Sequence, residues 1–276
     1  MRAARTAPSR PAAPRKPTLS PTRIRIFLEC ALQYRYIYLD KIGKFYLKSR
    51  AGFSFGSTLH HVLQEFHEQG AAQTPEEMVT RLETNWIGAG YESAEQEQRH
   101  RAAGEEIVQA YHAAHQERAV QQVETWATEK TITCDLGRFK LTGRVDRIDR
   151  HADGRLEIID YKSGRQETTP EEVAGSLAMN CYQLILRHLY PDTPVCATIY
   201  CLRSGVQASY ALEGETLAAF ERDLLALGHT ILDTDYSLLT PVRIPACDDC
   251  DFFPRCSRFW RQQAHEAPLD APHFDD

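Results

Sequence analysis

The sequence predicts an α/β domain whose central mixed sheet is flanked by helices. Its 276 residues are 42% hydrophobic and 25% charged, a composition typical of a chain that folds around a packed core. Apolar residues recur every three or four positions in some segments and every second position in others, which separates helices from strands. The two kinds of segment alternate along the chain, and this order favours a sheet covered by helices.

Charge and hydropathy restrict the classes of function. The chain has 32 Lys plus Arg against 38 Asp plus Glu, a net charge of −6, so binding to nucleic acid requires a local basic surface. No segment approaches the roughly 18 consecutive apolar residues of a membrane span, and the first residues lack the apolar core of a secretory signal. We therefore expect a cytoplasmic protein with no membrane partner.

The first part of the chain is expected to be helical after a disordered basic tail. Residues 1–18 contain Arg, Lys and Pro but no acid, and their prolines disfavour an organelle transit peptide. Ser20 and Pro21 predict the N-cap and first position of a helix. Residues 57–69 predict a second helix, with His60 at the edge of its apolar stripe. Residues 74–128 are rich in Ala, Glu and Gln and predict an insertion of two or three acidic helices.

The middle of the chain predicts the sheet. Apolar residues alternate over residues 130–150 and 155–162, and Asp153-Gly154 favours a tight turn between them, which predicts an antiparallel hairpin. The remaining elements are a helix over residues 171–189, strands over residues 194–203 and 206–212, and a long helix over residues 214–233. A cysteine-containing segment, residues 247–256, and an acidic tail, residues 261–276, complete the chain.

Alternation on the hairpin assigns side chains to the two faces of the sheet. We expect one face to carry Leu141, Gly143 and Val145, and the other to carry Thr142, Arg144, Asp146 and Ile148. On the partner strand, Asp160 and Lys162 share a face and leave the end of the strand together. Two carboxylates and an amine therefore converge at one edge of the hairpin.

This convergence indicates metal-assisted hydrolysis. Two carboxylates from adjacent strands can hold Mg²⁺, which prefers oxygen ligands, and a neighbouring amine can position or deprotonate a water that attacks a phosphodiester. An acid-x-Lys triplet is expected about once by chance in a chain of this composition. Spacing alone therefore leaves a solvated ion pair between Asp146 and Lys162 as an equal alternative.

Four ordered segments resemble the RecB-like branch of the PD-(D/E)XK nuclease superfamily. They are GSTLHHVLQEF, GRVDRID, IIDYKSG and MNCYQLILRHLY. The resemblance implies a restriction-endonuclease-like fold over residues 19–260, with the helical insertion at residues 74–128. It also implies that Mg²⁺ or Mn²⁺ is held by His60, Asp146, Asp160 and the backbone carbonyl of Tyr161, and that Lys162 acts on the water.

The last of these segments implies a further site residue. Gln183 corresponds to a polar residue that approaches the site or the DNA, but the Tyr that usually follows four residues later is Arg187 here, and Tyr182 could take its place. Each role has a structural alternative. His60 could be a core histidine, and Gln183 could be an amide on the helix surface.

Three clustered cysteines predict a second metal centre. Cys247, Cys250 and Cys256 form a C-x2-C-x5-C pattern, and a four-ligand site needs one more residue, for which Cys30 is the natural candidate. One early and three late cysteines are similar to the iron-sulfur RecB-like nucleases, which include AddB nuclease domains and CRISPR-adaptation nucleases. That resemblance implies a [4Fe-4S] cluster in residues 247–256. Zinc, with His265 or Cys30 completing the site, remains the alternative on spacing.

The expected function is therefore a metal-dependent deoxyribonuclease. The resemblance implies exonuclease-like action on single-stranded DNA or DNA ends, in repair, recombination or defence. One alternative is a DNA-end-binding assembly subunit for a helicase or integrase, docked through the acidic insertion; another is a zinc-containing structural domain with accidental carboxylates. The candidates for phosphate contacts are Arg144, Arg147, Arg165 and Arg187.

Overall fold

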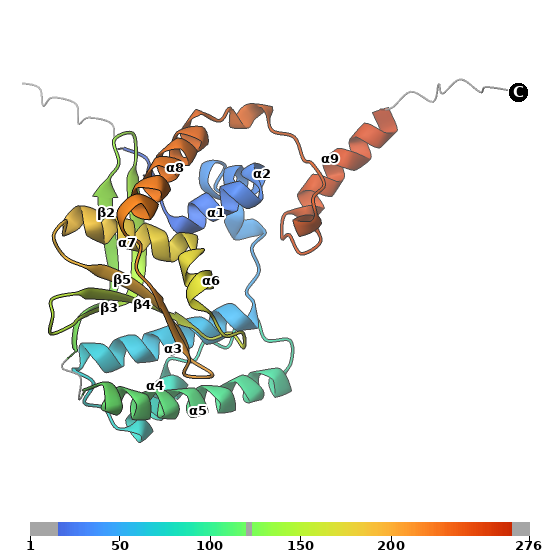
Figure 1. Ribbon diagram of the computed structural model, residues 1–276. Coiled ribbons are helices and arrows are strands. Elements are labelled where there is room, and N and C mark those ends of the chain that lie inside the picture. Colours follow the sequence, from blue (N-terminus) through green and yellow to red (C-terminus); the bar gives the residue numbers. More distant parts are fainter. Residues whose placement is uncertain (1–15, 120–122, 267–276) are drawn as a thin grey trace, which may run out of the picture.

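A six-stranded mixed sheet lies between two layers of helices (Figure 1). The computed structural model describes residues 16–119 and 123–266, so most of the predicted N-terminal and C-terminal tails lies outside the described residues. The sheet has the order β1-β3-β4-β5-β6, and β2 also pairs with β3. This mixed sheet flanked by helices is the predicted fold class. None of the helices in the described part of the chain is long and apolar enough to span a membrane.

The sheet has one more strand beside the predicted acids than the sequence predicted. β3 (Lys140–Arg150) and β4 (Leu156–Lys162) form the predicted antiparallel hairpin, but β2 (Glu124–Asp135) forms another hairpin with β3. The helical insertion therefore ends before residue 124, because residues 124–128, expected in the insertion, include Thr125, Trp126 and Thr128, which favour a strand. The sheet is completed by β1 (Thr18–Leu19), β5 (Val195–Cys201) and β6 (Gln207–Tyr210).

β1 shows that the predicted disordered tail is too long at its C-terminal end. Thr18 and Leu19 pair in parallel with Lys140 and Leu141 of β3. Lys16 Nζ lies 2.7 Å from a carboxylate oxygen of Asp135. Residues 16–18 of the predicted tail are therefore part of the fold.

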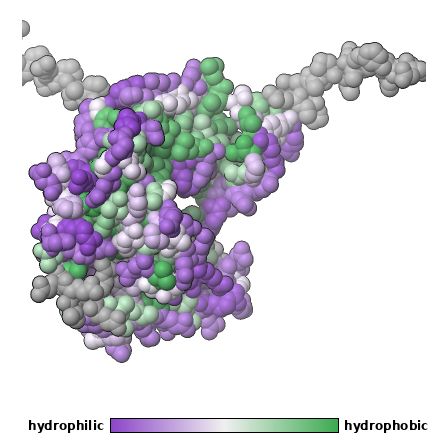
Figure 2. All heavy atoms as spheres, viewed as in Figure 1, coloured by the Kyte–Doolittle hydropathy of each residue, from purple (hydrophilic) through white to green (hydrophobic). Residues whose placement is uncertain are grey.

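The first helical layer covers one face of the sheet with α3 (Ala51–Glu68), α4 (Pro75–Thr84) and α5 (Ala94–Ala119). Buried side chains of all three helices pack together and against β4; they include Phe55, Leu59, Phe66, Met78, Leu82, Val108, Ile159 and Tyr161. The outward side of this layer is mostly hydrophilic in the view of Figure 2. The predicted insertion is therefore part of the core and cannot be a detachable docking module.

α3 begins six residues earlier than the prediction. Gly56, expected just before the helix, lies inside it. A Cβ at Gly56 would lie 3.2 Å from Oγ of Ser163, so the absence of a side chain lets α3 pass close to the end of β4. Arg50, the N-cap of α3, places Nη2 3.0 Å from Asp251 Oδ1, which ties this end of the helix to the cysteine-containing segment.

The second layer covers the opposite face with α1 (Pro21–Glu29), α7 (Leu177–Leu189) and α8 (Gly214–Asp233). Oγ of Ser20 accepts a hydrogen bond from the backbone N–H of Arg23, the predicted N-cap. The predicted helix over residues 171–189 is two helices, because Ser176 interrupts it and caps α7 through Met179 N. The short elements of the chain are α2 (Ala31–Tyr34), η1 (Arg35–Leu39), η2 (Gly43–Phe45), α6 (Pro170–Ala174), η3 (Tyr236–Leu238) and η4 (Pro245–Cys247).

The end of the described chain returns to the first helices. Phe252 is buried against Leu32 and Tyr36, and α9 (Phe253–Glu266) then leaves the main body (Figure 1). Residues 261–266 therefore continue a helix that the predicted acidic tail did not include. The rest of that tail lies outside the described residues.

Candidate active site

β3 changes face at Asp146. Leu141, Val145 and Ile148 all belong to the core beside α7 and α8, whereas Arg147 points to the α3 side. Strict alternation would place Ile148 on the other face of the sheet from Val145, as the sequence predicted. Because the two share a face, the alternation is interrupted between them. The pairing of β2 with β3 skips Glu129 and Asp146, and Glu129 has a φ of +43°, a conformation that residues with a side chain seldom adopt.

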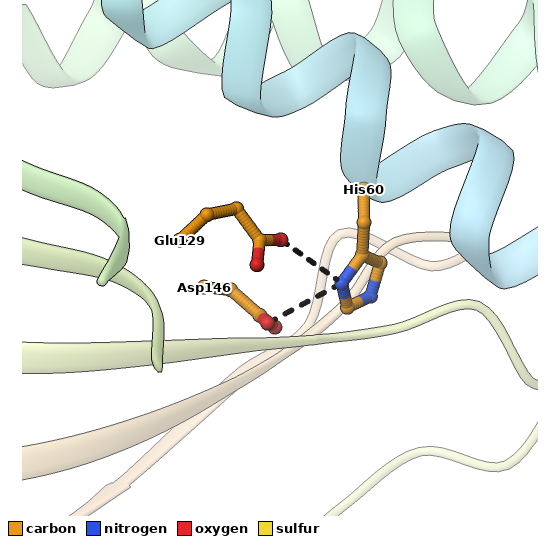
Figure 3. Close-up of side chains that lie close together, drawn as sticks. All are labelled: His60, Glu129 and Asp146. Atoms are coloured by element: carbon orange, nitrogen blue, oxygen red, sulfur yellow. Dashed lines mark ion pairs between the residues drawn. The ribbon is translucent and has the colours of Figure 1, made fainter. Parts of the chain in front are cut away.

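This irregularity turns two carboxylates toward α3. Figure 3 shows Glu129 and Asp146 pointing at His60, which projects from the helix. His60 Nδ1 lies 3.3 Å from Asp146 Oδ1 and 3.7 Å from Glu129 Oε1. Among the described residues, these three form the group whose potential ligand atoms all lie within 4.8 Å of one another. Sequence reasoning missed Glu129, because it lies between the expected insertion and the expected strand.

Tyr161 contributes its backbone to the same cluster. Its N–H donates to Asp146 Oδ2 at 2.7 Å, and its carbonyl oxygen lies 3.2 Å from His60 Nε2. Burial lowers the pKa of His60, but hydrogen bonds to Asp146 and Glu129 outweigh it and raise that pKa to about 10. The cluster therefore attracts positive charge strongly, and a divalent cation would compete with this proton for the same groups.

Asp160 and Lys162 form an ion pair beside the cluster. Burial raises the pKa of Asp160 against the opposing effect of the Lys162 charge. Burial lowers the pKa of Lys162, but Asp160 outweighs it and raises this pKa above its usual value. Lys162 is therefore held as an ammonium, with half of its side chain exposed, by Asp160, whose negative charge also raises the pKa of His60.

A cleft of about 530 Å³ opens onto these groups. Three of the predicted site residues line it, namely His60, Asp146 and Lys162. The basic residue Arg144 also lines it, and Arg144 Nε lies 2.6 Å from Glu129 Oε2. The residues that line it are Gly52, Phe53, Gly56, Ser57, His60, His61, Glu129, Arg144, Asp146, Tyr161, Lys162, Ser163 and Gly164. The cleft combines charged and apolar walls, opens to solvent and is large enough to admit part of an extended substrate.

The structure does not bring Gln183 to this cleft. Its side chain is fully buried, and Oε1 accepts a hydrogen bond from Leu212 N at 2.9 Å. The expectation that Gln183 approaches the site is therefore wrong, and the preceding residue of α7, Tyr182, faces the acids instead. The Tyr182 ring packs over Gly143, where a Cβ would lie 2.3 Å from that ring. Burial raises the pKa of Tyr182, and the negative charges of Asp160 and Asp146 raise it further.

Two of the four predicted phosphate contacts serve the interior instead. Arg147 is 2% exposed, forms an ion pair with Asp149 at 2.9 Å, and donates to Tyr161 Oη at 2.8 Å. Arg187 donates to the carbonyl of Thr193. Arg147 thus fixes the ring of the residue whose backbone meets His60, and neither arginine is placed to hold a bound strand.

The four predicted cysteines lie together at a second site. Cys30, Cys247, Cys250 and Cys256 line one cavity of about 240 Å³, whose other walls are mainly apolar. Cys30 is the extended residue between α1 and α2, and this break in the helix turns its side chain toward the late cysteines. Burial raises the pKa of the Cys250 and Cys256 thiols. The side chain of His265 lies outside the described part of the structure.

The other four cysteines serve packing. Cys134, Cys181, Cys196 and Cys201 are buried, and all four carry free thiols. This placement agrees with the sequence prediction that they behave as small apolar residues.

Comparisons with known proteins identify a matching family model and a similar fold. A family model described as the PD-(D/E)XK nuclease superfamily matches residues 18–257. No curated protein matches the chain. A solved structure from Eubacterium rectale, described as a candidate exonuclease, is similar with a TM-score of 0.53 and 13% identity, covering 92% of this chain and 89% of the other. The solved structure of SSO0001 matches at a TM-score of 0.33 and 13% identity, covering 84% of this chain and 97% of the other.

Proposed function

The chain belongs to the PD-(D/E)XK nuclease superfamily, and from this premise we propose that it is a metal-dependent deoxyribonuclease of the RecB-like branch. The observation that carries the proposal is the group formed by His60, Glu129 and Asp146 at the cleft, with the Tyr161 carbonyl against it and Lys162 beside it. The proposed substrate is single-stranded DNA or a DNA end, and the proposed setting is repair, recombination or defence.

The donor set fits Mg²⁺ or Mn²⁺. Mg²⁺ binds oxygen at about 2.1 Å, so two of its ligands are at most about 4.2 Å apart. The ligand atoms of His60, Glu129 and Asp146 lie within 4.8 Å, so small side-chain movements would bring them around one ion. In this proposal Glu129 takes the ligand position that the sequence gave to Asp160. A bound divalent cation would supply positive charge to stabilise the negative charge that develops on a phosphate oxygen.

The residues of the chain would do the rest of the work. Lys162 Nζ reaches the cleft as an ammonium held by Asp160, so it can orient a water or a phosphate oxygen by hydrogen bonding. Arg144 lies at the same opening with a half-exposed side chain and can neutralise backbone phosphate. Tyr182 packs behind the acids and excludes water from that side.

We also propose that the four cysteines hold a [4Fe-4S] cluster. All four line one cavity, which supplies the four thiolate ligands that a cubane cluster takes. The mainly apolar walls of the cavity suit a buried cluster.

Cleavage of end-labelled single-stranded DNA tests the proposed nuclease. We expect wild type to cleave with Mn²⁺ and to stop when the cation is chelated, whereas Lys162→Ala should lose about 100-fold or more in rate. Lys140→Ala is the matched control, since Lys140 lies exposed on β3. A folded wild type that cleaves neither single strands nor ends with Mn²⁺ would contradict the proposal and favour the end-binding subunit.

A further inference from the structure

A second cavity continues the catalytic cleft. It measures about 510 Å³ and shares Gly52, Phe53, Ser163 and Gly164 with the first. Its remaining walls are Arg50, Phe55, His100, Arg165 and Arg203. A groove therefore runs from the acidic cluster, past the first turn of α3, into a region rich in arginine.

Two arginines in this region form no ion pair. Among the described residues, neither Arg165 nor Arg203 has a carboxylate within ion-pair distance, whereas Arg35, Arg101 and Arg138 do. Burial lowers the pKa of Arg203 and the nearby positive charge of Arg165 lowers it further, while the more weakly acting charge of Glu106 opposes this. Two like charges close together repel each other, and an anion placed between them would relieve this repulsion.

Arg203 is also fixed in place. Its Nε donates to the carbonyl of Ser163 at 2.9 Å, and its guanidinium lies over the ring of Phe55, 5.1 Å from the centroid. These contacts reduce the entropy that an arginine loses when it binds a ligand. Ser163 follows Lys162 directly, so Arg203 is held beside the strand end that carries the catalytic candidates.

Phe53 lies at the junction of the two cavities and is 68% exposed. It precedes His60 by two helical turns, about 10 Å along the axis of α3. An aromatic side chain left in water beside a charged groove offers a flat apolar surface for a nucleotide base. A base within a duplex is already stacked on both faces, so only an unpaired nucleotide can use this surface.

We propose that Phe53, Arg165 and Arg203 bind the unpaired DNA strand next to the scissile phosphate, with a base stacked on Phe53 and the backbone phosphate on the two arginines. This inference rests on the proposed nuclease function and names the part of the cleft that selects single strands. It adds Phe53 and Arg203 to Arg165, one of the four phosphate contacts that the sequence predicted.

Binding without cleavage tests the site. The full chain is titrated with a fluorescein-labelled oligothymidylate in EDTA, between about 50 and 200 mM salt, and fluorescence anisotropy is recorded. Phe53→Ala should weaken binding about tenfold, and Phe53→Trp should restore it. The Arg165→Ala, Arg203→Ala double variant should reduce the slope of log K against log salt by roughly 1.4, the value for two lost phosphate contacts.

Matched variants control for surface charge and aromaticity. Phe45→Ala removes a phenyl of similar exposure outside the groove, and Arg222→Ala removes an exposed arginine on α8. Both should bind as wild type does. Arg165→Glu is the variant least able to disturb folding, because Arg165 is exposed, and it should weaken binding more than Arg165→Ala.

The outcomes separate this site from the nuclease activity. A wild type that binds the oligonucleotide through these residues but does not cleave it with Mn²⁺ would support the strand site and overturn the nuclease. A wild type that cleaves while all groove variants bind normally would overturn the strand site alone. Failure of wild type to bind in EDTA, or equal affinity for a duplex of the same length, would also overturn it.

Discussion

The catalytic cleft and the cysteine cavity both join residues that are distant in sequence, but they are built differently. His60 lies on the long helix α3, and Asp146 and Lys162 lie on the paired strands β3 and β4. The buried Arg147 of β3 donates a hydrogen bond to Tyr161 of β4. The cysteines stand on a break between helices, a single turn and the start of α9. The buried apolar residues around them are Leu32, Tyr36 and Phe252.

This difference predicts different dependence on bound groups. The large core fixes the cleft residues whether or not a cation is present. The three buried residues beside the cysteines contribute roughly 1.5–3 kcal/mol each, so a bound group has to supply much of the stability of that segment. Losing the cation should therefore cost activity, whereas losing the cluster should cost structure.

The largest expected effect is at the cysteine cavity. Cys250→Ala should abolish the brown colour expected of the proposed [4Fe-4S] cluster and lower both solubility and melting temperature, because losing one of four thiolate ligands leaves an iron unprotected and makes the cluster labile. Visible absorption, iron content and thermal unfolding measure this. Cys134→Ala removes a buried thiol outside the cavity and should keep the colour. A soluble, brown Cys250→Ala protein would remove the basis of the comparison.

The next effect is at the cleft and has the opposite character. Glu129→Gln should reduce cleavage at least about 100-fold through loss of a cation ligand. Its melting temperature should change little, because the substitution removes repulsion from Asp146 together with attraction to Arg144 and to protonated His60. Glu124→Gln, at the exposed start of β2, is the control. Retained activity in Glu129→Gln would return the ligand role to Asp160.

The smallest effect measures how tightly α7 packs against the cleft. Gly143→Ala places a methyl group against the ring of Tyr182 and should cost about 1–3 kcal/mol of unfolding free energy. In a Tyr182→Ala background the same substitution should cost less, because the clash is gone. Urea unfolding of wild type, the two single variants and the double variant gives the free energies for this cycle. An equal cost in both backgrounds would show that contact with Tyr182 is not the reason for the cost of Gly143→Ala.

The parts of the site that could be predicted are those encoded by short motifs. His60, Asp146 and Lys162 lie within the segments that resembled the nuclease family, and the structure brings them to one cleft. Cys30, Cys247, Cys250 and Cys256, which the sequence and the family resemblance named as the cluster ligands, likewise line one cavity. The fold class followed from the alternation of helical and strand periodicity.

The parts that failed depend on local departures from periodicity. Glu129 enters the site through a positive φ, and Asp146 stands where β3 leaves strict alternation, so a rule with a period of two misplaced Ile148. Gln183 and Tyr182 differ by one residue of helical phase, which a motif does not resolve. Such shifts are decided by tertiary packing, which the sequence pattern does not contain.

The distance between Cys30 and the other cysteines has a consequence for biosynthesis. More than two hundred residues separate Cys30 from Cys247. At about 5–20 residues per second, a ribosome needs roughly 10–40 s to pass from one to the other. During this time the strands that carry Asp146 and Lys162 have left the ribosome, while Cys30 still lacks its three partners. Closure of the cysteine cavity therefore follows synthesis of the strands of the cleft, and it joins a segment made before them to one made after them.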